Sequence, residues 1–131
     1  MKKSILIIVA MFFCQAALAQ TAVDEALKSY SENGKLKFDA KRGQAMWSKK
    51  FPAKDGKDRQ CTSCHGADLA KDGKHAKSGK LIKPMAASVN PKRYTKLKKI
   101  NKWFKRNCKW TVGRECTNQE KGDILKYLSQ L

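Results

Sequence analysis

Two cysteines three residues apart, followed directly by a histidine, constrain this chain more than any other feature of its sequence: Cys61-Thr62-Ser63-Cys64-His65. Two thiols on one helical turn can reach the two vinyl groups of a single haem and form thioethers with them. The histidine is then held over one face of the ring, where its imidazole can ligate iron. We therefore expect one covalent haem c, attached through Cys61 and Cys64 and ligated by His65.

Paired cysteines also occur in thioredoxin-like redox sites and in zinc sites. A thioredoxin-like site requires a βαβ context, which this sequence does not indicate. A zinc site requires a second close pair of ligands, and the remaining pair, Cys108 and Cys116, is eight residues apart. The haem interpretation is therefore favoured over both.

The low content of apolar residues after the N-terminal segment also indicates a bound apolar group. The chain has 131 residues, enough for one domain, and 41% of them are apolar. Residues 1–19 hold 15 of these, and the remainder is only about 35% apolar, which is little for a short chain with its own core. A haem would fill such a core, and it would organise the long irregular stretch over residues 51–90.

The N-terminus has the three parts of a secretory signal peptide. Two lysines follow Met1, an unbroken apolar run covers Ile5–Phe13, and Ala17-Leu18-Ala19 supplies small residues for cleavage. The run has nine residues, which is too few to span a bilayer. We expect cleavage after Ala19 and a soluble domain over residues 20–131, exported to the periplasm and without a membrane span. The alternative is a buried N-terminal helix.

Apolar spacing and capping residues predict an all-α chain, because no segment alternates with a period of two. Asp39 can cap one helix, and Thr117-Asn118-Gln119-Glu120 is a capping box that opens the last. Gly43 and Trp47 lie one turn apart and can pack on the last helix, which resembles the contact of the first and last helices in class I cytochromes c. The expected helices cover residues 21–33, 39–49, 96–107 and 117–128.

Cys108 and Cys116 flank the junction between the last two expected helices. With the other two thiols taken by haem, a disulfide between them is the state favoured in an oxidising compartment. The alternative is two buried free thiols.

Three residues are candidates for the sixth iron ligand. Met85 follows Pro84 and would make a Met/His electron carrier, but it can also pack on the haem as a core residue. His75 lies in a lysine-rich loop that is typical of a solvated segment. Asn107 continues the apolar positions 97, 100 and 104 on one face of its helix, although an asparagine can also cap a helix end.

The stretch 61–131 resembles the Sphaeroides haem protein family of small, secreted, high-spin cytochromes c. The resemblance rests on several short segments: residues 61–68, Gly79-Lys80, Ile82-Lys83-Pro84, Ser88 with Pro91, Arg93-Tyr94-Thr95, Lys102-Trp103-Phe104, Arg106-Asn107-Cys108, residues 113–117 and Glu120-Lys121, with Arg42-Gly43 upstream.

The resemblance implies a set of roles for these residues. In that family the asparagine of the Arg-Asn-Cys triplet is the sixth ligand, which is Asn107 here, and the disulfide cysteines match Cys108 and Cys116. The position of Met85 is commonly leucine there. Family members bind O₂, NO or CO and exchange electrons with a dihaem cytochrome c. This sequence departs from the pattern in a longer lysine-rich loop over residues 71–80.

The charge of the chain indicates an acidic partner. Lys and Arg number 29 against 11 Asp and Glu, for a net charge of +18, and loss of residues 1–19 would leave +16. The run 92–109 holds nine basic residues and no acid. It is either a solvated helix face or a docking surface for an acidic redox protein that is steered electrostatically. Nucleic acid is not expected, because the chain is exported and at least two of the three aromatics in this run are needed in the core.

Overall fold

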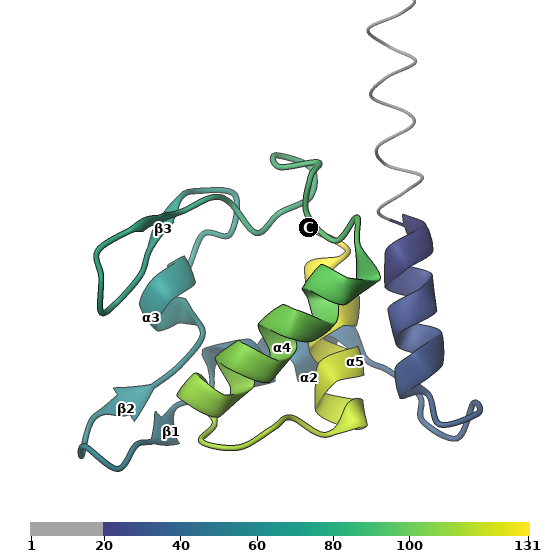
Figure 1. Ribbon diagram of the computed structural model, residues 1–131, viewed down its shortest axis with the longest axis horizontal. Helices are drawn as coiled ribbons and strands as arrows, with labels where there is room; N and C mark the ends of the chain where they lie inside the picture. The colour runs from purple at the N-terminus through teal and green to yellow at the C-terminus, as the bar shows by residue number, and fades with distance from the viewer. Residues whose placement is uncertain (1–19) are drawn as a thin grey trace, which may run out of the picture.

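The computed structural model describes residues 20–131, and the signal peptide expected over residues 1–19 lies outside the described residues. Residues 20–30 form a helix. The elements that follow are α2 (Ala40–Ser48), β1 (Phe51–Pro52), β2 (Asp58–Arg59), α3 (Thr62–His65), β3 (Gly73–Lys74), β4 (Leu81–Ile82), α4 (Leu97–Thr111) and α5 (Asn118–Leu128), as Figure 1 shows. The all-α fold predicted from the sequence is confirmed. No helix within residues 20–131 is long and apolar enough to cross a membrane.

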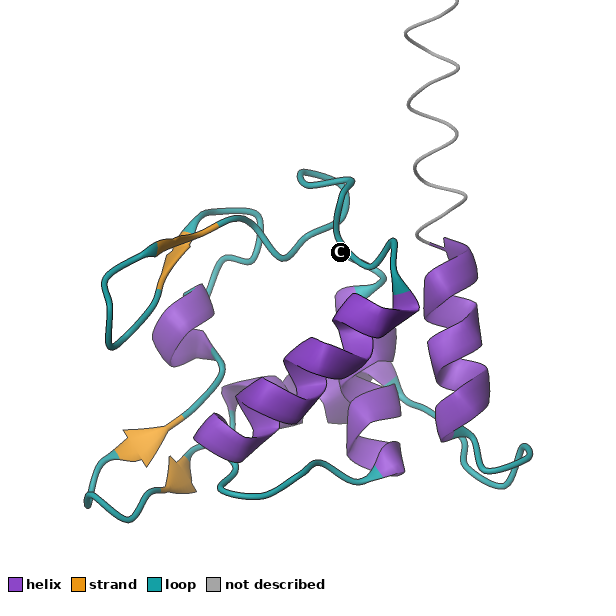
Figure 2. Cartoon of the chain, in the orientation of Figure 1, coloured by secondary structure: helices purple, strands orange, loops and turns teal. Residues whose placement is uncertain are grey.

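The strands are two short antiparallel pairs inside the segments expected to be loops. Phe51 pairs with Arg59 in the first, and Gly73 pairs with Ile82 in the second. Figure 2 shows both pairs at one side of the molecule, away from the helix of residues 20–30. Each pair closes an irregular loop by a few backbone hydrogen bonds, too local for a period of two to appear in the sequence.

Helices α2 and α5 cross in close contact. A Cβ at Gly43 would lie 2.0 Å from the carbonyl oxygen of Asp123, so only glycine permits this approach. The Asp123 carboxylate accepts hydrogen bonds from the backbone N–H of Asp39 (2.7 Å) and from Nε and Nη2 of Arg42 (2.8 and 2.9 Å). Asp39 caps α2 by accepting from the Arg42 N–H at 2.8 Å, as expected. The side chain of Asp123 therefore fixes the start of α2 on α5.

Two of the expected helix ends are wrong. The first helix stops at residue 30 and turns through Glu32 and Asn33, which both have positive φ. Helix α4 runs to Thr111, one turn beyond the expected end at Asn107. It continues because Cys108 and Thr111 extend the buried face begun by Ile100, and the chain turns at Gly113 with φ +83°. The capping box of α5 is confirmed, with Thr117 and Glu120 bonding each other's backbone N–H.

Buried residues form two clusters. One joins the helix of residues 20–30 to α4 and α5 through Tyr30, Ile100 and Leu125. The other joins α2, α5 and the loop after α3: Trp47, Leu69, Ile124 and Leu128. Tyr94 and Phe104 are partly buried against both clusters, whereas Trp103 is 47% exposed, so two of the three aromatics of the basic run belong to the core.

Candidate haem site

Helix α3 is a single turn that carries the two free thiols. The N–H of His65 bonds the carbonyl of Cys61 at 3.2 Å, and Gly66 ends the turn with φ +73°. Cys61 and Cys64 are half-buried and unbridged, and residues at this spacing lie on one face of a helical turn. Burial raises the pKa of the Cys61 thiol to about 11, so it is protonated at neutral pH.

His65 is the last residue of this turn, and its ring faces α2. Its ring contacts the Trp47 ring, with centroids 5.2 Å apart. Burial, assisted by the positive charge of Arg93, lowers the pKa of His65 to about 4. The imidazole is therefore neutral at pH 7, which is the form that ligates a metal.

Two buried polar atoms within residues 20–131 have no hydrogen-bond partner: Nδ1 of His65 and Nε1 of Trp47. Buried polar atoms are normally paired, so an unpaired one indicates a partner that the chain does not supply. Both atoms lie at the same His65–Trp47 contact, next to the two free thiols. A neutral imidazole, two thiols on one turn and unpaired polar atoms fit a covalently bound haem.

Met85 lies against the same apolar cluster as Cys61. Its N–H donates to the carbonyl of Leu69 at 2.9 Å, and its carbonyl accepts from the Tyr94 hydroxyl at 2.8 Å. The backbone of Met85 is thus fixed on both sides while its side chain packs on the cluster. This placement is compatible both with a core role and with ligation.

Asn107 lies within α4 and is exposed, so the expectation that it shares the buried face is wrong. It does not cap the helix either, because α4 continues for four residues. Its side-chain amide forms no hydrogen bond within the described chain. Phe104, one turn earlier, packs on the cluster that includes Cys61, which places Asn107 at the edge of the same side of α4.

His75 is exposed at the turn between β3 and β4, as its loop position predicts. Its Nδ1 accepts from the N–H groups of Lys77 (3.3 Å) and Ser78 (3.1 Å) and lies 3.0 Å from the Ser78 hydroxyl. His75 therefore stabilises its own turn through Nδ1.

Cys108 and Cys116 are joined by a disulfide with an S–S distance of 2.03 Å. The bridge ties the last turn of α4 to the residue before Thr117, which caps α5. It lies one residue after Asn107, so the helix end that carries this amide is held to α5.

Comparison with known proteins places the chain. Residues 33–128 match a family described as Domain of unknown function (DUF1924). The chain is 34% identical over 124 residues to the Cytochrome c-type protein SHP of Cereibacter sphaeroides (strain ATH 2.4.1.), with 95% of each chain covered. The chain belongs to the SHP family of c-type cytochromes.

Solved structures of SHP relatives share the fold. The structure of oxidised SHP, described as an oxygen-binding cytochrome c, has a TM-score of 0.74 and 35% identity, and the match covers 83% of this chain and 96% of that one. Oxidised cytochrome c'' from Methylophilus methylotrophus has a TM-score of 0.73 and 30% identity, covering 87% and 94%. Cytochrome c'' is 36% identical in sequence over 86 residues, which are 66% of this chain and 60% of that protein. The cytochrome c fold expected from Gly43, Trp47 and the last helix is confirmed.

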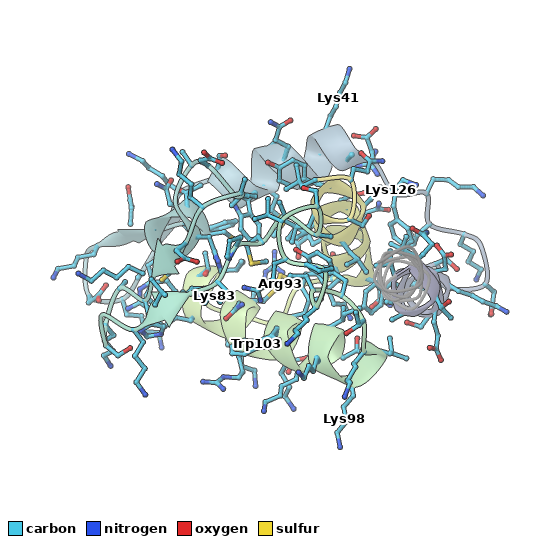
Figure 3. All side chains as sticks on the ribbon, turned by 90° about the horizontal axis from the view of Figure 1, so that it is seen from above. Lys41, Lys83, Arg93, Lys98, Trp103 and Lys126 are labelled. Carbon is cyan, nitrogen blue, oxygen red and sulfur yellow. A yellow bond between two sulfur atoms is a disulfide. The ribbon has the colours of Figure 1, made fainter. Side chains whose placement is uncertain are left out.

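One residue near the candidate haem site was not identified as functional from the sequence. Arg93 donates from Nε to the carbonyl of Pro84 at 2.8 Å and from Nη2 to the carbonyl of Lys83. Asn90 donates to the same Pro84 carbonyl at 3.1 Å. In the view from above in Figure 3, Arg93 lies over the middle of the molecule, whereas Lys98 points outward from α4. Arg93 thus fixes the segment before Met85 and places a positive charge near His65; its only sequence signal was its place in a segment shared with the family.

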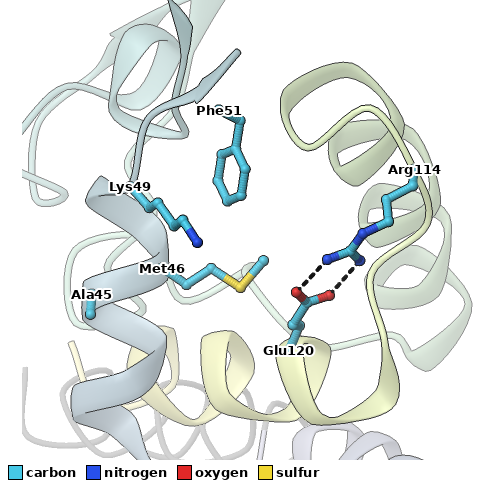
Figure 4. A pocket seen from close by; sticks show the side chains of 6 residues that line it. All are labelled: Ala45, Met46, Lys49, Phe51, Arg114 and Glu120. Atoms are coloured by element: carbon cyan, nitrogen blue, oxygen red, sulfur yellow. Dashed lines mark hydrogen bonds and ion pairs between the residues drawn. The ribbon is translucent and has the colours of Figure 1, made fainter. Parts of the chain in front are cut away.

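A separate depression in this SHP-family chain lies between α2, β1 and the loop before α5 (Figure 4). It has a volume of about 430 Å³, and Arg114 crosses one side of it in a bidentate ion pair with Glu120 (2.7 Å for both bonds). None of the expected haem ligands lines it.

Proposed function

We propose that this chain is a periplasmic monohaem c-type cytochrome that accepts electrons from an acidic redox partner and binds O₂ or NO at its iron. The haem would be attached through Cys61 and Cys64, with His65 and Asn107 as the axial ligands. When bound, haem supplies a redox-active iron with a coordination position for a diatomic molecule. The observation that carries the proposal is the neutral His65, with its unpaired Nδ1, on the same turn as two free thiols.

Asn107 is the residue proposed to make this cytochrome a gas binder. An amide oxygen is a hard, neutral and weak ligand, so it favours Fe(III) over the softer Fe(II). No intrachain hydrogen bond within residues 20–131 competes for the Asn107 amide, which is therefore available in the oxidised state. An Asn107 ligand would therefore hold reduced iron only weakly, which would leave a coordination position available to O₂ or NO.

The surroundings of Asn107 suit a ligand that leaves and returns. The disulfide at Cys108 and the buried Thr111 hold the last turns of α4, so withdrawal requires only rotation of the side chain.

The partner is proposed from charge. A net charge of +16 on the exported chain would attract an acidic protein over a distance set by ionic strength. A dihaem cytochrome c is the electron donor implied by the family resemblance, and we propose the same class here.

The second candidate is a low-spin electron carrier with Met85 as the sixth ligand. The packing of Met85 on the cluster that includes Cys61 favours it, because the side chain then lies near the attachment segment. The two candidates differ in one property: a Met-ligated ferrous haem is closed to added gas, whereas an Asn-ligated one is open.

Absorption spectra of the purified haem protein test the two candidates. We expect the reduced wild type to shift on addition of CO. Asn107→Ala should alter the oxidised spectrum, whereas Met85→Leu, which conserves volume, should leave it unchanged. A reduced protein that is six-coordinate and does not react with CO would refute the proposal. Loss of the wild-type oxidised spectrum in Met85→Leu would establish Met85 as the sixth ligand.

A further inference from the structure

The hairpin that covers the attachment segment carries a lysine at every third position. We define the lysine hairpin as residues 71–83, with β3 and β4 at its centre and five exposed lysines: Lys71, Lys74, Lys77, Lys80 and Lys83. Lys71 lies 3.4 Å from Asp68, and Lys83 lies 3.8 Å from Asp72. Within residues 20–131 the three central lysines have no acidic partner, so their charges are directed at solvent.

The lysine hairpin is fixed against the two attachment residues. A Cβ at Gly73 would lie 2.3 Å from the carbonyl oxygen of Cys64 and 2.9 Å from Cα of His65, so β3 contacts α3 without an intervening side chain. The N–H of Ala76 donates to Sγ of Cys64 at 3.3 Å. Figure 1 shows β3 directly beside α3. The hydrogen bonds to the His75 ring hold the turn, so the three central lysines project from a fixed platform over Cys64.

A shallow depression lined in part by an apolar residue lies at the same place. It has a volume of about 530 Å³ and lies between α3 and the hairpin; its lining includes Cys64, Lys74 and Leu81. Leu81 is 62% exposed, so an apolar side chain beside the lysines is open to contact by another protein. An apolar centre with a charged rim is the usual composition of a protein interface.

We propose that the lysine hairpin is the docking surface for the acidic redox protein, with carboxylates on Lys74, Lys77 and Lys80 and an apolar contact on Leu81. This inference rests on the proposed function, and it adds where the partner binds. It places the partner against Cys64, through which the haem would be attached.

The other basic surface, on α4, is less suited to this role. Lys98, Lys102 and Lys105 are exposed and unpaired within the described residues, but they lie on roughly the opposite side of α4 from Asn107. A partner bound there would be separated from the Asn107 side by the width of a helix, about 10 Å. We assign this α4 face to general electrostatic attraction.

Zero-length carbodiimide cross-linking, which joins lysine amines to carboxylates in contact, tests the proposal. An acidic flavodoxin serves as the probe, and the cross-linked lysines of the haem protein are mapped by mass spectrometry. We expect cross-links at Lys74, Lys77 and Lys80. Cross-links concentrated on α4, cross-links spread evenly over all exposed lysines, or none at all would overturn the proposal.

A pair of triple variants with equal charge change provides the matched control. The first carries Lys74→Gln, Lys77→Gln and Lys80→Gln, and the second carries Lys98→Gln, Lys102→Gln and Lys105→Gln. The association rate with flavodoxin at low salt should fall about tenfold in the first and about twofold in the second, and the difference should vanish at about 0.15 M salt, where charges are screened beyond about 8 Å. Equal losses in both variants would overturn the docking surface.

Two further measurements distinguish the docking surface from the proposed gas-binding function and from a membrane-binding role. The first triple variant should keep the wild-type CO response, because its substituted side chains are solvent-exposed and are not proposed iron ligands. If the wild type itself does not bind CO, the proposed function is wrong, and the cross-link map alone decides the docking surface. Binding to phosphatidylglycerol vesicles tests a membrane role. If the first variant loses vesicle binding but keeps the wild-type association rate with flavodoxin, the hairpin is a lipid-binding surface and the proposal is wrong.

Discussion

Replacing Gly43 with alanine tests how closely α2 and α5 must approach. A Cβ at this position would lie 2.0 Å from the carbonyl oxygen of Asp123 and 2.5 Å from its carbonyl carbon. Cβ atoms essentially never approach closer than 3.0 Å to another heavy atom, so the helices must separate by about 1 Å. The obstructing atoms are backbone, and no rotation of a side chain can relieve the overlap.

The cost follows from two opposing effects. Overpacking of this kind destabilises by about 1–3 kcal/mol, and the upper end applies here because backbone must move. Separation also lengthens the hydrogen bonds from Asp39 and Arg42 to Asp123. Alanine favours the helix over glycine by about 1 kcal/mol. We therefore expect Gly43→Ala to reduce the free energy of unfolding by about 2 kcal/mol.

Urea unfolding of the haem-loaded protein, followed by far-ultraviolet circular dichroism, measures this change. Gln44→Ala, at the adjacent exposed position of α2, should stay within about 0.5 kcal/mol of the wild type. The oxidised absorption spectrum of Gly43→Ala should also change, because Trp47 on α2 contacts His65 at 5.2 Å. A Gly43→Ala protein as stable as the wild type would refute the close-contact argument.

The remaining predictions concern Asp123 and the disulfide. Burial alone would raise the pKa of Asp123, but hydrogen bonds from Arg42, the Asp39 N–H and Gln119 hold it below its ordinary value. The stabilisation by ionised Asp123 is therefore complete above about pH 4 and is lost as the pH falls through the lowered pKa. Asp123→Asn should reduce the free energy of unfolding by about 1–3 kcal/mol at pH 7. The difference in Tm between the variant and the wild type should disappear by about pH 2–3. Replacing Cys108 and Cys116 together with serine should cost about 2–3 kcal/mol and leave the haem attached. The oxidised spectrum of this double serine variant should move toward a water-ligated or five-coordinate form, as in Asn107→Ala, while CO binding to the reduced protein persists. An unchanged oxidised spectrum would mean that the bridge does not position Asn107.

The local elements of this fold were predictable because their signals lie within a few residues. Asp39 and the Thr117–Glu120 box satisfy the first N–H groups of their own helices, so the starts of α2 and α5 are properties of short sequences. The turn that carries Cys61, Cys64 and His65 is likewise local. The glycine at position 43 indicated a close helix contact before the partner residue was known.

Tertiary structure decided what depends on residues far apart in the chain. Helix α4 continues beyond its expected end because Cys108 and Thr111 are buried, so Asn107 lies within the helix and not at its end. The sequence pattern gives Asp123 no special role. In the structure it accepts hydrogen bonds from Asp39 and Arg42, which are more than 80 positions away in the chain. The lysine spacing over residues 71–83 was visible in the sequence, but its contact with Cys64 was not, because the contact arises only when β3 pairs with β4 and packs on α3. Hydrogen bonds between residues close in sequence can be predicted from short sequence patterns. Burial and contacts between distant residues cannot, because they form only when the whole chain packs.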